Sequence, residues 1–279
     1  MKWLFALLFA ALVFGGAAYF SYKIILRPEI VMREEKKAEA TPRPLPDLSL
    51  PEFQAAAKIK ASGKLLEARA ALTAFIQKYP SGQHVGEAQD LLGEVNASIL
   101  LSNYPSPEKE EYVVRSGDVL ARIAAKMKST PELIMRTNDL SGTMLHIGDK
   151  LLISHPEFSM LIQRNAKLLY LLDHDRFFKR YHLHSVNVPG KTPPKLNTHV
   201  AGVMAYKDGK RIGIGSRDYL NSTRWIRLAA PGYVLYSEPD ESHPVLDMPP
   251  PPEGIGLSAT DVEELSSLVN MKTAVTVTP

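Results

Sequence analysis

An uncharged apolar stretch lies near the N-terminus, where the residues from Trp3 to Tyr22 form one run behind Lys2. As a helix this run would span about 30 Å, the thickness of a bilayer core. We therefore expect residues 1–27 to be either a membrane anchor or a signal peptide. The run is longer than the apolar core of a usual signal peptide and resumes at Ile24, which favours an uncleaved anchor.

The next two segments differ sharply in pattern. Residues 28–51 are charged and then rich in proline, which is typical of a semi-rigid extended linker. Residues 52–104 show helical periodicity instead. Apolar side chains recur on one helix face at Leu65, Ala68, Leu72, Phe75, Ile76 and Tyr79. Pro80 ends this helix, because proline has no backbone N–H to donate.

Residues 111–154 predict a small module of two strands and two helices. A strand from Tyr112 to Arg115 turns at Gly117 into a helix, for which Asp118 is the expected N-cap. Thr130 and the proline after it begin a second helix, which ends near Asn138. A turn at Gly148 then leads into the second strand. The order is strand, helix, helix, strand.

Residues 157–279 show short alternating runs that indicate a mostly β domain. We expect strands at 158–162, 168–172, 177–186, 199–206, 210–214, 225–228, 233–236 and 274–277, with a helix at 261–269. The Asp208-Gly209 pair predicts a hairpin turn between two of these strands. The whole pattern predicts an α+β multidomain fold with an N-terminal transmembrane helix.

Composition excludes several classes of function. The 279 residues carry a net charge of only +3 with dispersed basic side chains, so we expect no nucleic-acid partner. The chain has no cysteine, which excludes disulfides, thiolate metal sites and a cysteine nucleophile. His182 and His184 share a strand face, but no third ligand follows at a suitable spacing. We therefore expect neither a metal nor a cofactor.

The module at 111–154 resembles the LysM (lysin motif) family along its whole length. The matching positions are Tyr112, Val114, Gly117, Asp118, Leu120, Ile123, Ala124, Ile134, Asn138, Leu145, Gly148, Leu151 and Ile153. Val119 departs from the pattern, since the family has a hydroxyl side chain there. LysM modules bind N-acetylglucosamine-containing polymers in a shallow groove between two loops.

The resemblance implies a glycan-binding groove between the loop after the first strand and the loop after the second helix. The implied residues are Gly117, Asp118, Val119 and Leu120 on one side, and Asn138, Asp139 and Leu140 on the other. Asp118 could serve as a helix cap, as a ligand contact or as both. For Leu120 a place in the core of the module is the favoured alternative.

The helical segment at 52–104 resembles a tetratricopeptide repeat in its glycine, its Glu67-Ala68 pair and its Pro80. The resemblance covers about one and a half repeats, fewer than such units usually need to bury a core. We therefore expect it to pack on a neighbouring domain or on a second chain. Its role is either to dock a protein partner or to act as a plain spacer.

Residues 157–279 resemble the L,D-transpeptidase catalytic domain, most specifically at 223–233 and 254–269. Family members cross-link peptidoglycan through a cysteine paired with a histidine. Here Tyr236 stands at the histidine position, Gly254 at the cysteine position and Gly256 at the arginine position. The resemblance therefore implies a degenerate domain without catalytic residues.

These expectations combine into one functional hypothesis. We expect a single-pass protein of the cytoplasmic (inner) membrane whose bulk faces the periplasm or cell wall, where its LysM module binds peptidoglycan. The alternatives are a peptidoglycan-remodelling enzyme with a relocated nucleophile, and a scaffold that recruits another wall protein through the helical segment. The main hypothesis predicts a binding protein and not an enzyme.

Overall fold

The computed structural model describes residues 3, 19, 22–23, 27, 47–190 and 193–279. The chain divides into two compact units, Met1–Leu48 and Ser49–Pro279. Most of the expected anchor and linker therefore lies outside the described residues. Among the residues that are described, no helix is long and apolar enough to cross a membrane. The second unit contains the helical segment, the strand-helix-helix-strand module and the β domain.

The helical segment consists of α3 (Leu50–Ala61), α4 (Leu65–Lys78) and α5 (Val85–Leu100). The predicted stripe on α4 is confirmed, since Ala68, Leu72 and Phe75 are buried among residues of the other two helices. Gly63 makes the turn between α3 and α4 with a φ of 76°, a backbone conformation that glycine adopts without strain.

The small module has the predicted order. Strand β1 (Lys109–Val113) pairs antiparallel with β2 (Lys150–Ser154), and α6 (Leu120–Lys126) and α7 (Pro131–Thr137) lie between them in the chain. The predicted cap of the second helix is confirmed, because Thr130 Oγ1 accepts a hydrogen bond from Leu133 N at 3.0 Å. The core is made by residues of α6, α7 and β2 together with the residue that follows β1: Val114, Leu120, Ile123, Ala124, Ile134, Met135, Leu151 and Ile153.

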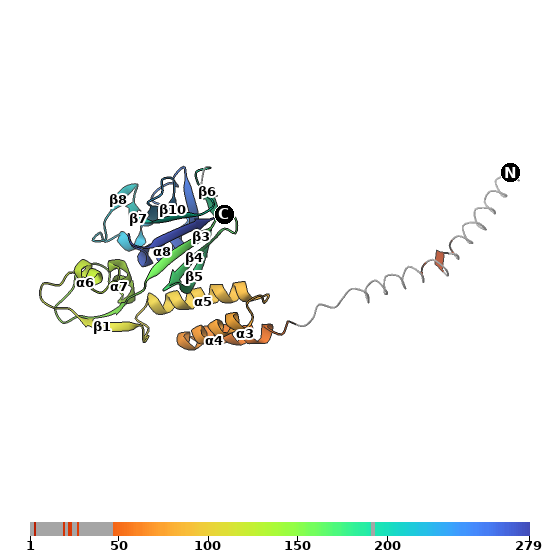
Figure 1. The fold of residues 1–279 in the computed structure, drawn as a ribbon, viewed down its shortest axis with the longest axis horizontal. Coiled ribbons are helices and arrows are strands. Elements are labelled where there is room, and N and C mark those ends of the chain that lie inside the picture. Colours follow the sequence, from red (N-terminus) through yellow and green to blue (C-terminus); the bar gives the residue numbers. More distant parts are fainter. Residues whose placement is uncertain (1–2, 4–18, 20–21, 24–26, 28–46, 191–192) are drawn as a thin grey trace. The chain divides into compact units, whose positions relative to one another are not determined.

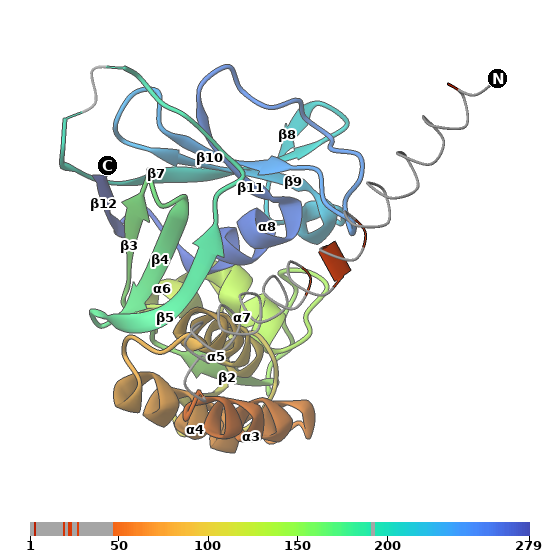
Figure 2. The same cartoon turned by 90° about the vertical axis from the view of Figure 1, so that its right-hand side faces the viewer.

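The β domain is built on a ten-stranded sheet. Its strands are β3 (Phe158–Gln163), β4 (Leu168–Asp173), β5 (Arg176–His182), β6 (Ser185–Asn187), β7 (Leu196–Lys207), β8 (Lys210–Ile212), β9 (Thr223–Leu228), β10 (Val234–Glu238), β11 (Gly254–Ser258) and β12 (Ala274–Thr278). The spatial order is β5-β4-β3-β12-β7-β9-β10-β11-β6, and β8 pairs with β7. Helix α8 (Ala259–Leu268) packs against β9, β10 and β11, as Figure 2 shows.

Strand β7 joins the two halves of this sheet. Its first residues pair with β12 and its later ones with β9, and the register shifts between Val200 and Gly202. Most predicted strands, the hairpin turn at Asp208 and the C-terminal helix are confirmed. One predicted strand was wrong and one strand was missed. The single strand at 177–186 is divided into β5 and β6, and β11 was not predicted at all.

The helical segment packs on the β domain and covers one edge of its sheet. Strand β5 is the edge strand at one end of the sheet order, with β6 at the other end, and α5 lies along β5 in Figure 1. Asn96 on α5 donates to the carbonyl of Phe178 at 2.7 Å, which satisfies a backbone acceptor that an open edge would leave exposed. Arg180 binds Asp90 through two nitrogens, at 2.5 and 2.8 Å. The expected packing on a neighbouring domain is therefore confirmed.

The small module is also fixed to the β domain. The fully buried Arg224 of β9 binds Glu132 of α7 at 2.9 Å, and Glu132 is itself only 4% exposed. Arg136 Nη2 lies 2.6 Å from Glu263 of α8. Ile214 and Leu220, from the segment between β8 and β9, pack against the core of the module. The module is thus held in one orientation by buried contacts.

Candidate functional site

The two loops predicted to line the glycan groove lie side by side at one end of the module. They are the loop before α6, residues 114–119, and the loop between α7 and β2, residues 138–149. Val114 N donates to Asp149 O and Gly148 N donates to Val114 O, both at 2.9 Å. Gly117 and Gly148 have φ values of 82° and 95°, which permit these tight turns. The backbone therefore joins the start of the first loop to the end of the second.

Asp118 does not cap α6, so the predicted N-cap was wrong. The N-cap is Val119, without a side-chain cap. Asp118 Oδ2 instead accepts hydrogen bonds from Arg115 N at 2.8 Å and from the hydroxyl of Tyr112 at 2.9 Å. These two bonds, the one from Arg115 first, lower the pKa of the Asp118 carboxyl. An ionised Asp118 thus ties its loop back onto the end of β1.

Asn138 stabilises the second loop. Its side-chain nitrogen donates to Ile134 O at 2.8 Å and to Leu152 O at 2.9 Å, and its side-chain oxygen accepts from Leu152 N at 2.7 Å. The amide therefore links the end of α7 to β2, and its hydrogen-bonding groups are turned toward the protein. The next residue, Asp139, is exposed with a φ of 53°.

The remaining predicted residues differ in exposure. Leu120 is 2% exposed and belongs to the core, which confirms the alternative favoured for it. Leu140 is half-buried against the same core. Val119 is 52% exposed and Gly117 lies on the surface beside it. On the first side of the groove, Val119 is thus the exposed apolar side chain.

Two further apolar residues of the second loop were missed from the sequence. Met144 is 81% exposed and Ile147 is 73% exposed. Large apolar side chains so open to water, on a loop that hydrogen bonds fix at both ends, are suited to contact a ligand. Their apolar character was visible in the sequence, but their exposure was not, because residues 139–149 form no regular element whose period would show it.

The three positions that the sequence resemblance marks as degenerate catalytic ones lie on two neighbouring strands, with Tyr236 on β10 and Gly254 and Gly256 on β11. Tyr236 of β10 is in register with Gly256 of β11, which is in register with Ser185 of β6. The Ser185 and Tyr236 hydroxyl oxygens are 2.8 Å apart, and both hydroxyls donate to the carboxylate of Glu238. His184 Nδ1 lies 3.4 Å from the same carboxylate. Burial raises the pKa of Tyr236, so this phenol stays protonated at neutral pH.

This polar cluster fills the space that side chains at 254 and 256 would need. A Cβ atom on Gly254 would lie 2.6 Å from the carbonyl oxygen of Val234 and 2.9 Å from the ring of Tyr236. Gly254 also has a φ of 150°, which side chains rarely tolerate. A Cβ atom on Gly256 would lie 2.5 Å from Ser185 Oγ and closer still to Glu238. Neither position can hold a larger residue without rearrangement.

Residues 112–154 match the family model of the LysM domain. This module is a LysM domain. The LysM resemblance identified from the sequence is thereby confirmed. The matched residues include both loops described above. Asp118 fixes the first loop and Asn138 fixes the second.

Solved structures similar to this chain include L,D-transpeptidases. One from Mycobacterium smegmatis is 12% identical with a TM-score of 0.31, and the match covers 48% of this chain and 65%, less than two thirds, of that one. L,D-transpeptidase 1 of Mycobacterium tuberculosis is 11% identical with a TM-score of 0.30. The match covers 48% of this chain and 68% of that one. An L,D-transpeptidase from Enterococcus faecium is 10% identical with a TM-score of 0.29. The match covers 67% of this chain and 83% of that one.

These TM-scores are too low to define the fold of the β domain. No curated protein sequence matches this chain.

Proposed function

We propose that this protein binds peptidoglycan through its LysM domain and recognises N-acetylglucosamine-containing glycan there. The observation that supports the proposal most is the match of residues 112–154 to the LysM family. Sugar rings have apolar faces, and binding sites combine apolar surface with a few oriented polar groups. Val119, Met144 and Ile147 offer such surface on the two loops.

The test is a sedimentation assay of the full-length protein with insoluble peptidoglycan. Met144→Asp places a charge on the predicted binding surface and is expected to weaken binding about tenfold. Met271→Asp is the matched control, because Met271 is also an exposed methionine, at 69%, but lies in the β domain. Equal binding by the two variants would refute the assignment of the glycan to these loops.

We also propose that the protein is held at the cytoplasmic membrane by residues 1–27, with the LysM domain facing the cell wall. The proposal rests on the length of the uncharged run from Trp3 to Tyr22 and on the position of the glycan outside the membrane. Intact mass spectrometry of the protein purified from membranes is expected to find Met1 or Lys2 at the N-terminus. A chain that begins near Ala18 would contradict the anchor.

We further propose that the β domain is a transpeptidase-like domain without catalytic activity. The sequence motifs at 223–233 and 254–269 support the likeness. Acyl transfer through cysteine needs a thiolate and a base, whereas the chain has no cysteine and a protonated tyrosine at the histidine position. Incubation of the protein with tetrapeptide muropeptides should leave them unchanged. Cross-linked dimers above a heat-inactivated control would support the enzyme hypothesis instead.

A further inference from the structure

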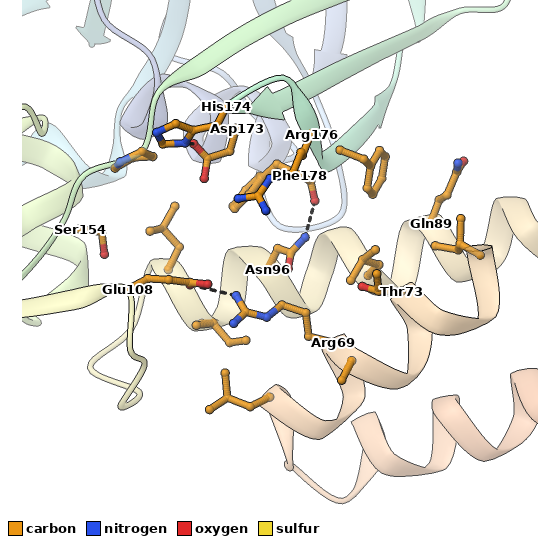
Figure 3. A pocket seen from close by; sticks show the side chains of 18 of the residues that line it. Arg69, Thr73, Gln89, Asn96, Glu108, Ser154, Asp173, His174, Arg176 and Phe178 are labelled. Atoms are coloured by element: carbon orange, nitrogen blue, oxygen red, sulfur yellow. Dashed lines mark hydrogen bonds and ion pairs between the residues drawn. The ribbon is translucent and has the colours of Figure 1, made fainter. Parts of the chain in front are cut away.

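A groove of about 960 Å³ lies between the helical segment and the β domain, outside the LysM loops. Figure 3 shows α4 and α5 below it, and the hairpin of β4 and β5 above it. This volume lies at the upper end of the range for ligand sites. Partly exposed apolar side chains of its lining come from α4 and from the hairpin, and include Leu66, Ala70, Ile76 and Phe177. Leu92 and Ile99 of α5 also line it but are buried in the core of the helical segment.

Two polar contacts connect the elements that form the walls of the groove. Asn96 fixes α5 to the hairpin through the carbonyl of Phe178. Arg69 of α4 binds Glu108 at 2.9 Å, which connects α4 to the residue before β1. The hydrogen bond from Arg69 lowers the pKa of Glu108, so the pair is ionised at neutral pH. The groove is thus a built feature of three packed elements.

One cation of the groove has no partner of its own. The guanidinium of Arg176, at the start of β5, lines the groove but makes no hydrogen bond or salt bridge within the described part of the chain. Arg176 is exposed, and the carboxylates beside it have other hydrogen-bond partners: Glu108 binds Arg69, and Asp173 Oδ1 lies 2.8 Å from His174 Nδ1 and accepts from Glu157 N at 2.9 Å. Charge complementarity therefore favours an occupant that carries a carboxylate near Arg176.

A second observation also indicates a ligand. Ser154, the last residue of β2, lines the groove and is only 4% exposed. Its hydroxyl oxygen is buried and has no hydrogen-bond partner among the described residues. Buried polar atoms are rarely left unpaired in native proteins, because the missing bond costs free energy. Rotation about one bond turns a serine hydroxyl toward a new partner.

We propose that this groove binds an extended polypeptide segment of a partner protein, with large apolar side chains and one carboxylate. The apolar side chains pack on α4 and on the hairpin, the carboxylate binds Arg176, and the peptide backbone binds the hydroxyl of Ser154. Peptidoglycan stem peptides also carry carboxylates. Their side chains are mostly small, however, and would leave the leucine, isoleucine and phenylalanine surface of the groove largely uncovered.

The experiment selects a phage-displayed library of short random peptides on the full-length protein. Counter-selection uses Ala74→Trp, because Ala74 is an exposed residue of α4 that lines the groove and tryptophan would fill it. We expect enriched sequences in which large apolar residues flank an aspartate or glutamate. If no sequence is enriched, if the enriched sequences lack an acidic residue, or if they bind Ala74→Trp equally, the proposal is refuted.

The enriched peptide is then synthesised with its acidic residue and with the matching amide, and binding is measured by fluorescence anisotropy. Arg176→Ala is expected to weaken the acidic peptide about tenfold and the amide peptide less than about twofold. Arg211→Ala, an exposed arginine on β8 outside the groove, should change neither. Equal loss for both peptides would mean that Arg176 does not recognise the carboxylate and would overturn that assignment.

Ser154→Ala separates a binding role from a structural one. It removes an unsatisfied hydroxyl, so the melting temperature should stay the same or rise while peptide affinity falls about threefold. Unchanged affinity would exclude Ser154 from the site. Tetrapeptide muropeptide serves as a competitor, and its displacement of the peptide would show that the groove binds the stem peptide instead. Sedimentation with peptidoglycan tests the LysM proposal separately, since the groove shares no residue with its loops.

Discussion

The buried ion pair between Arg224 and Glu132 should make the attachment of the LysM domain sensitive to a single substitution. Arg224 Nη1 lies 2.9 Å from Glu132 Oε2, and the two side chains are 0% and 5% exposed. Glu132→Ala would leave the guanidinium buried without its counter-ion. Removal of one partner from a buried pair costs about 3–5 kcal/mol.

The cost of Glu132→Ala should lie toward the lower end of this range, because Arg224 keeps other partners. Arg224 keeps hydrogen bonds to Ser222 Oγ at 3.0 Å and to the carbonyl of Tyr219, and its Cζ atom lies 3.9 Å from the centre of the Tyr219 ring. We therefore expect a loss of about 3 kcal/mol in the free energy of unfolding. For a domain of this size the loss corresponds to about 6–12 °C in melting temperature.

The assay is thermal and urea unfolding of the full-length protein, followed by circular dichroism. Glu67→Ala is the matched control, because Glu67 pairs with Lys64 at 3.2 Å but both side chains are 61% exposed. Such a surface pair contributes at most about 1 kcal/mol. The double variant Glu132→Leu with Arg224→Met should recover most of the stability, because it leaves no buried charge.

A loss for Glu132→Ala no larger than that for Glu67→Ala would refute the reasoning. It would show that water reaches Arg224 in solution, and that the LysM domain is not held on the β domain by a desolvated pair. A large loss that the double variant does not recover would point to packing and not to charge as its cause.

Two other substitutions test contacts described above. Asn138→Ala removes three hydrogen bonds and should cost about 2 kcal/mol in urea unfolding and weaken peptidoglycan binding, whereas unchanged stability would contradict the role of this amide in fixing its loop. Burial alone would raise the pKa of Asp90, but the hydrogen bond and charge of Arg180 lower it overall. The pair therefore stabilises the folded protein above the unfolded pKa of about 4, and this stability is lost as the pH falls through the lower pKa of the folded state. Melting temperatures measured from neutral to acidic pH should therefore fall less steeply for Asp90→Asn than for the natural chain, and parallel curves would exclude this pair as a source of acid sensitivity.

Much of the fold follows from local patterns in the sequence. The strand from Leu168 and the helix from Leu65 were predictable because their apolar periods extend over several residues and match the buried faces. The LysM domain was predictable because its residues keep the family spacing from Tyr112 to Ile153. Strand β11 was missed because Gly254 and Gly256 lower its strand propensity, while its partner β10 ends sixteen residues earlier in the sequence.

The contacts that shape the candidate sites depend on residues distant in the chain. Asp118 precedes a helix and therefore looked like its cap, but the hydroxyl of Tyr112 from the neighbouring strand competes for the same carboxylate. The pair of Glu132 with Arg224 joins residues 92 positions apart. The groove around Arg176 likewise forms only where α4, α5 and a hairpin of another domain meet. Local sequence patterns do not predict contacts between residues so far apart in the chain.

The crowding around Gly254 has a consequence for how this domain can change in evolution. A cysteine introduced at position 254 would collide with the Tyr236 ring and with the Val234 carbonyl, and would be strained by the backbone angle. A histidine introduced at position 236 would have no thiol to activate, because the chain has no cysteine, and it would leave the contact with the Val234 carbonyl in place. Substitutions at these two positions alone therefore cannot build a cysteine–histidine pair on this backbone.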